Sequence, residues 1–139
     1  MSQRLAGESG PEVVIWDEGA VHMAHNAFAH IERPPRAEEV LEFGELVPKP
    51  DLLIRVRASS DVALTRVLSR GHKRTDGDTS AVASLLTNAE RVFSLLAQVD
   101  SIQDRMLGID NDSADLEDLG SHAEAIVRLV HRLDQTGAR

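Results

Sequence analysis

Apolar residues recur along this chain in two different periods, and the period predicts which segments are strands and which are helices. A short continuous apolar run at 13–16 has the pattern of a strand that is buried on both faces, and two further strands are predicted at 52–57 and 106–109. Elsewhere apolar residues return every three or four positions, as they do in helices that bury one face. The helices that this spacing predicts cover 20–31, 36–47, 61–70, 80–103 and 115–134.

The order of these segments predicts the fold class. Strands that alternate with helices are typical of an α/β protein, because parallel neighbours need long crossover connections. We therefore expect a three-layer parallel sheet with helices on both faces, and Trp16 in its core. Polar residues follow two of the strands, at 17–18 and 110–112, and ligands of such sheets bind where the strands end.

Segments without periodicity separate the predicted elements. Residues 1–11 are polar and contain glycine, and we expect them to form a frayed end. Residues 71–79 combine glycines with charged and ionisable side chains, which predicts a mobile lid-like loop. Ser59 and Ser80 are placed to cap the helices that follow them. Because no segment repeats and the length suits one unit, residues 1–139 are expected to form a single domain.

Two arginines, Arg66 and Arg70, lie four residues apart at the end of the helix predicted at 61–70. This spacing places both guanidinium groups on one helix face, where they converge on whatever lies beyond the helix end. Guanidinium groups match phosphate oxygens through their planar fork of donors. The pattern indicates a protein that handles phosphate, and two solvated arginines on an amphipathic helix are the equally open alternative.

Composition narrows the possible partners. The net charge of −8 and the pI near 5.1 argue against sequence-independent binding to nucleic acid, which needs a basic face. No apolar run approaches the ~20 residues of a membrane helix, and the N-terminus lacks the pattern of a signal peptide. The absence of cysteine excludes disulfides and thiol chemistry. We therefore expect a cytoplasmic protein that binds no membrane and no nucleic acid.

Three segments with recognisable motifs follow one another along the chain. VVIWDEG at 13–19 resembles a strand that ends in an acidic residue beside a phosphoryl-transfer site. PDLLIRVRASSDVALTRVLSRG at 50–71 resembles a strand, a helix and the entry to a lid, including an R-x-x-x-R-G pattern. MLGIDNDSADLEDL at 106–119 resembles a final strand and the loop that borders an adenine. Over about residues 12–134 the chain thus resembles the C-terminal two-thirds of a P-loop kinase, with thymidylate kinases and deoxynucleoside kinases as the closest groups.

The resemblance implies an ATP-dependent phosphotransferase and assigns roles to particular residues. Asp17 would bind the water shell of Mg²⁺ or act as the base toward the acceptor hydroxyl. Glu18, which we assign with Asp17 and Arg70 to the catalytic residues, stands where many relatives have an arginine, and this favours an acceptor other than a nucleoside monophosphate. Arg66 would border the adenine of ATP, as would the backbone around Asn111, and Arg70 would reach the transferred phosphate when the lid closes.

Other ionisable residues give weaker signals. Lys73 and Arg74 would add charge at the nucleotide site, although ordinary solvated loops have the same composition. His22 and His25 have a spacing that can bind a metal, but no third ligand follows at a good spacing. We expect these two histidines and His30 to line the acceptor pocket or to be exposed.

The motif that holds the phosphates in P-loop kinases, G-x-x-x-x-G-K-[ST], does not occur in the 139 residues. In the family this loop follows a strand that lies between those matching 13–16 and 52–57. Three explanations stay open. The leading one is a fragment of a larger kinase that binds ATP weakly or not at all alone. A second chain or a swapped segment of a twin could instead supply the strand, or the chain has kept its fold without catalysis.

Competing functions follow from these explanations. An ATP-dependent kinase is the first hypothesis, and a non-catalytic interaction module derived from a P-loop kinase fold is the second. Another P-loop enzyme, such as a sulfotransferase, fits less well because paired arginines precede a charged loop. The apolar helix at 80–103 offers a face for a homodimer, but packing on its own sheet is the favoured interpretation.

Overall fold

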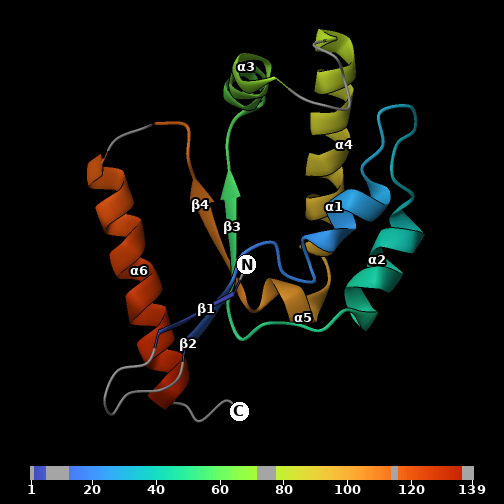
Figure 1. The fold of residues 1–139 in the computed structure, drawn as a ribbon. Coiled ribbons are helices and arrows are strands. Elements are labelled where there is room, and N and C mark those ends of the chain that lie inside the picture. Colours follow the sequence, from blue (N-terminus) through green and yellow to red (C-terminus); the bar gives the residue numbers. More distant parts are fainter. Residues whose placement is uncertain (1, 6–12, 72–77, 114–115, 136–139) are drawn as a thin grey trace.

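The computed structural model describes residues 2–5, 13–71, 78–113 and 116–135, which form a mixed α/β structure (Figure 1). Its strands are β1 (Ser2–Leu5), β2 (Val13–Trp16), β3 (Leu53–Arg57) and β4 (Met106–Asp110). Its helices are α1 (Met23–Phe28), α2 (Ala37–Leu46), α3 (Ser60–Arg70), α4 (Thr79–Leu96), α5 (Asp100–Gln103) and α6 (Leu116–Gln135). Most predicted elements are therefore present close to their expected positions.

Strand pairing differs from the predicted three-layer parallel sheet. β3 and β4 pair in parallel, with Leu53 opposite Met106 and Arg57 opposite Asp110. β2 is not part of this sheet and pairs antiparallel with β1, which lies in the segment expected to be frayed. The prediction failed here because four residues are too short a run for their periodicity to reveal a strand. The described chain therefore has a two-stranded parallel sheet and a separate two-stranded antiparallel one.

The hydrophobic core lies among the helices and does not surround the sheet. α4 packs against α1, α2 and α3, with α2 on the side away from β3 (Figure 1). The largest fully buried side chains of the core are Leu96, Ile102, Val40, Val82 and Val92. Burial of each such side chain contributes ~1.5–3 kcal/mol, so this cluster is the main source of stability in the described structure.

A glycine allows two of the core helices to approach closely. A Cβ atom on Gly44 of α2 would lie 2.8 Å from Val99 Cγ2 and 3.1 Å from Leu96 Cδ2. Such distances leave no room for a side chain. Gly44 therefore lets the backbone of α2 lie directly against the end of α4 and the start of α5.

Local chemistry sets the helix ends at several positions that the sequence placed differently. The carboxylate of Asp78 accepts hydrogen bonds from the backbone N–H groups of Ser80 and Ala81, at 2.8 and 3.3 Å, so Asp78 and not Ser80 caps α4. The helix expected at 80–103 is divided into α4 and α5. Ser59 is at the N-cap of α3 as predicted, but its hydroxyl makes no capping hydrogen bond.

Several apolar residues expected inside are exposed. Trp16 was predicted to be sheet core, but 69% of its surface is exposed, and Val14 and Ile15 are each 52% exposed. Within the described residues β2 has one sheet neighbour, β1, and no helix makes more than a slight contact with it, so β2 cannot bury both faces. Leu46 on α2 is exposed as well. The continuous apolar pattern of β2 is therefore not matched by burial among the described residues.

Two further expectations concern the predicted lid and the absence of a membrane-spanning helix. Arg74 and Lys73 lie in the segment 72–77, outside the described residues, as does most of the predicted lid at 71–79. In the part of the chain that the structure describes, no helix is long and apolar enough to cross a membrane.

Candidate functional site at the ends of β3 and β4

The carboxyl ends of β3 and β4 lie side by side, as the parallel pairing requires, and the chain segments that leave them are joined. The backbone N–H of Asn111 donates to the carbonyl oxygen of Arg57 at 2.7 Å. The carboxylate of Asp112 accepts from the backbone N–H of Ser59 at 2.5 Å. The segment after β4 is thereby held against the start of α3.

Arg66 reaches from α3 to this same edge of the sheet. Its guanidinium donates to the carbonyl oxygens of Asn111, at 2.7 Å, and Asp112, at 3.4 Å. The side chain is partly buried, and its planar guanidinium is held between the helix and the backbone that follows β4. The structure therefore brings together Arg66 and Asn111, two residues that the resemblance assigns to the same adenine.

Arg70 lies one turn further along α3 and is exposed. Its Nε donates to the carbonyl oxygen of Arg66 at 3.3 Å, so the side chain runs back along its own helix. Gly71 ends the helix with a φ of +74°, a conformation that glycine adopts at little cost. Arg70 is therefore the last residue of α3.

An ion pair that the sequence analysis did not single out completes this edge. Arg57 and Asp110 occupy the last, directly opposed positions of the two strands, and their side chains lie 2.9 Å apart. Both are substantially exposed, so the pair contributes little to stability. The signal was available in the sequence, because Arg55 and Arg57 alternate in a strand of a sheet that was expected to be covered by helices on both faces.

Asp17 and Glu18 lie away from this edge. They follow β2, which is level with the start of β3 in Figure 1, whereas α3 lies beyond the end of β3. Both are exposed, and within the described ranges no hydrogen bond or ion pair joins either one to Arg66 or Arg70. Glu18 has a φ of +54°, which is uncommon for a residue with a side chain. The predicted catalytic carboxylates and the predicted arginines are therefore in two separate places.

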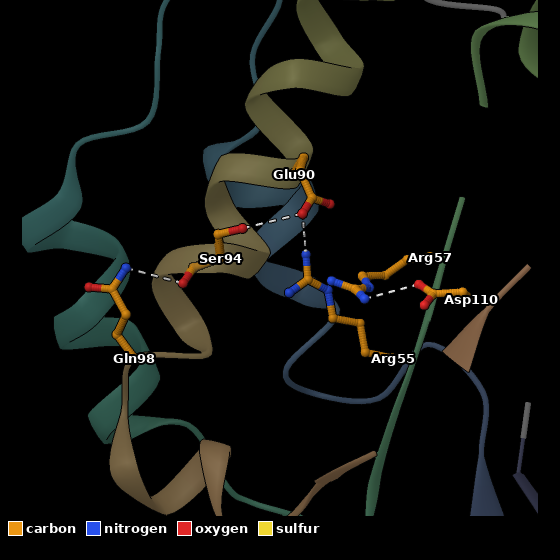
Figure 2. Close-up of polar contacts among 6 residues, drawn as sticks. All are labelled: Arg55, Arg57, Glu90, Ser94, Gln98 and Asp110. Carbon is orange, nitrogen blue, oxygen red and sulfur yellow. Dashed lines mark hydrogen bonds and ion pairs between the residues drawn. The ribbon is translucent and has the colours of Figure 1, made fainter. Parts of the chain in front are cut away.

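A second polar cluster lies on the face of β3 that α4 covers. Arg55 projects from the middle of β3 and its guanidinium lies 2.7 Å from Glu90 Oε1 of α4 (Figure 2). Only 13% of the Arg55 side chain is exposed. Its guanidinium carbon lies 5.8 Å from the ring centroid of Phe93, within the range of a cation–π contact. Sequence analysis missed this cluster because its members are far apart in the chain.

Two of the predicted pocket histidines pack on this cluster. The ring of His25 stacks on Phe93 with a centroid separation of 6.4 Å, and His22 lies 5.9 Å from the same ring. His30 lies elsewhere, with its ring nitrogen 3.4 Å from the guanidinium of Arg33. Among residues 2–5, 13–71, 78–113 and 116–135, no three histidine or acidic side chains are placed to hold a metal ion.

A shallow groove of about 330 Å³ runs between α4 and the segment that follows α1. Asn88 helps to form it by donating to the carbonyl oxygens of His30, at 2.6 Å, and Arg33, at 3.1 Å. None of the residues assigned to a site from the sequence lines this groove. The expectation that the histidines line an acceptor pocket therefore stays a prediction.

The edge of the sheet offers chemistry that suits a planar, polar ligand. Partly buried Arg66 presents the flat face of a cation while its N–H groups donate to the carbonyls of Asn111 and Asp112, and Arg57 lies at the same edge paired with Asp110. Searches for similar proteins found no matching family, no matching curated protein and no matching solved structure.

Proposed function

We propose that this chain supplies part of an ATP-dependent phosphotransferase of the P-loop kinase type, with its nucleotide bound at the ends of β3 and β4. The observation that carries the proposal is the contact of Arg66 with the backbone of Asn111 and Asp112. The resemblance implies that Arg66 and the backbone around Asn111 both border the adenine. Their meeting at the carboxyl edge of a parallel sheet supports the assignment.

Each residue of the edge has a role in the proposal. Arg66 stacks on or borders the base, since a guanidinium plane packs well on an aromatic ring. Arg70 is exposed at the end of α3 and would turn toward the phosphates as a charged donor. The backbone around Asn111 reads the edge of the adenine. Because the G-x-x-x-x-G-K-[ST] motif is not among the 139 residues, the proposal assigns the phosphate cradle to a segment outside them.

The carboxylates would act only together with the segment that supplies the phosphate cradle. Asp17 is an exposed carboxylate after a strand, a donor type that suits Mg²⁺, which binds proteins through one or two carboxylates together with substrate phosphates. When bound, the metal would neutralise charge on the phosphates. This chain would orient the water shell of the metal ion through Asp17, or Asp17 would accept the proton of the acceptor hydroxyl.

The proposal is tested on the base rather than on the phosphates, because a chain without the cradle binds a triphosphate poorly. Titration of the ¹⁵N-labelled protein with AMP at millimolar concentration should shift the amide signals of Asn111 and Asp112, and CMP should shift them much less. Arg70→Ala should weaken binding of ADP more than binding of adenosine. Arg91→Ala, which removes an exposed arginine on α4, is the matched control and should change neither.

Two results would overturn the assignment. One is the absence of shifts at Asn111 and Asp112 while signals elsewhere respond. The other is an equal response to AMP and CMP, which would show that the edge binds phosphate or any nucleotide without reading adenine.

A second candidate function, a non-catalytic interaction module, is favoured by a different observation. The strands β2 and β3 expose several large apolar side chains, of which Trp16 is the most exposed. Apolar surface of this kind marks sites of protein–protein contact. Under this alternative, Asp17→Asn leaves partner binding intact, whereas the kinase proposal predicts loss of phosphoryl transfer in the complete enzyme.

A further inference from the structure

One edge of β3 has backbone groups that no other strand of the described residues pairs with. The N–H of Leu53 donates to the carbonyl of Arg105, and the carbonyl of Arg57 accepts from Asn111, so the odd-numbered residues of β3 direct their backbone groups toward β4. In a parallel ladder the residues between them direct theirs to the opposite edge. Ile54 and Val56 therefore present two N–H and two C=O groups at an edge that no described strand pairs with.

The side chains beside this edge are arranged in two chemically different rows. Ile54 and Val56 point away from α4 and are 39% and 59% exposed. Arg55 and Arg57 point to the other face, where their guanidinium groups lie close to Glu90 and Asp110 (Figure 2). A strand added at this edge would continue both rows, one apolar and one lined by arginine.

Strands with an exposed hydrophobic edge are sites where another strand adds. Pairing of two copies of this chain is disfavoured by the arginine row. In the antiparallel register that satisfies Ile54 and Val56 of both copies, Arg55 of one copy would lie directly opposite Arg55 of the other. A carboxylate in that position is favourable instead, because a guanidinium has five donors and can bind Glu90 and a second acid together.

We propose that the free edge of β3 binds an extended segment of another protein chain, with apolar residues beside Ile54 and Val56 and acidic residues beside Arg55 and Arg57. The segment adds as a third strand of the β3–β4 sheet. Its backbone satisfies the four free groups, and its alternation of apolar and acidic side chains sets the register. This inference rests on the edge of β3 and not on the nucleotide site. It competes with the kinase proposal for this edge, because that proposal would place the strand before the phosphate cradle beside β3.

The test uses a defined peptide and the intact chain. An acetylated and amidated Val-Glu-Val-Glu-Val-Glu-Val peptide, about as long as a typical strand, is compared with the same peptide carrying Gln for Glu. Both are titrated at physiological salt, which screens the net charge of −8. The amide of Leu53 is an internal control, because it is already bonded to Arg105.

The Glu peptide should slow hydrogen exchange of the Ile54 and Val56 amides at least about tenfold and leave that of Leu53 unchanged. It should bind about tenfold more tightly than the Gln peptide. Val56→Pro removes one free donor without touching the β4 ladder and should abolish binding, whereas Val56→Ala should retain it. If the proline variant fails to fold, hydrogen exchange of the unchanged protein with the Glu peptide still tests the inference.

Three outcomes would overturn the inference. The first is no protection at Ile54 and Val56 with millimolar Glu peptide. The second is equal affinity for the Glu and Gln peptides, which would remove the acidic requirement. The third is a dimer in light scattering that Val56→Pro dissolves, which would show a second copy at this edge. Because the nucleotide titration is read at Asn111 and Asp112, failure of either proposal can be told from failure of the other.

Discussion

The helical region and the strand region of this protein bury their apolar residues to different extents. In the helical region, formed by α1, α2, α4 and α5, ten residues make one buried cluster around α4, and a glycine lets two helices touch. In the strand region, formed by β2, β3, β4 and α6, large apolar side chains such as Trp16, Val56 and Val127 are exposed. The helical region thus has a buried core, although Leu46 and Met23 on its outer surface are exposed, whereas Ile109 is the one buried apolar residue among those described in the strand region.

This difference predicts which substitutions destabilise the protein. Leu96→Ala empties a position with no exposed surface in the centre of the helical cluster, and should lower the free energy of unfolding by ~3 kcal/mol. Val127→Ala on α6 removes a side chain that is already 53% exposed, and should cost less than ~1 kcal/mol. Urea denaturation followed by circular dichroism measures both. Equal losses would show that α6 is packed as tightly as α4 and would break the comparison.

The same contrast appears at two helical glycines, with effects of opposite sign. Alanine is a better helix former than glycine by about 1 kcal/mol. At Gly120 of α6 no atom lies within 4 Å of the added Cβ, so Gly120→Ala should raise stability by ~0.5–1 kcal/mol. At Gly44 the Cβ would collide with Val99 and Leu96, so Gly44→Ala should lower stability by ~1–2 kcal/mol in spite of the gain in propensity.

Thermal unfolding of the two variants beside the unchanged protein gives the signs directly. A stabilising Gly44→Ala would mean that Val99 yields easily and that the core is looser than the buried cluster implies. A destabilising Gly120→Ala would mean that α6 has a close neighbour at that face.

The sequence predicted helices well because their apolar periodicity extends over many residues and reports burial of one face. α2 and α3 begin and end within about two residues of their predicted limits. The sequence did not predict which strands pair with one another. A run such as 13–16 reports a preference for extended backbone, but it does not say which strand lies beside it, since pairing depends on contacts distant in the chain.

The candidate site shows the same limit. The spacing of Arg66 and Arg70 predicted a shared helix face, and the resemblance predicted that Arg66 and Asn111 lie near one ligand. The first expectation follows from helix geometry alone, and both arginines do lie on α3, four residues apart. The contact between Arg66 and Asn111 agrees with the second expectation. The place of Asp17 relative to these arginines depends on a sheet that β2 does not join in the described structure. Its assumed nearness could not follow from residue types alone.

The smallest effect expected lies at the boundary of the two regions, where Arg55 of β3 meets Glu90 of α4. Arg55 is mostly buried but Glu90 is 60% exposed, so water screens their attraction and a double-mutant cycle with alanine should give a coupling of about 0.5–1 kcal/mol. The matched pair Arg57 and Asp110, exposed on both sides, should give less than ~0.5 kcal/mol and lose it first as salt is added. A coupling at Arg55 and Glu90 no larger than the exposed pair's would show that α4 does not hold the sheet through this contact. The two regions would then be joined chiefly by apolar packing, such as that of Leu53 and Met106 on the helical cluster.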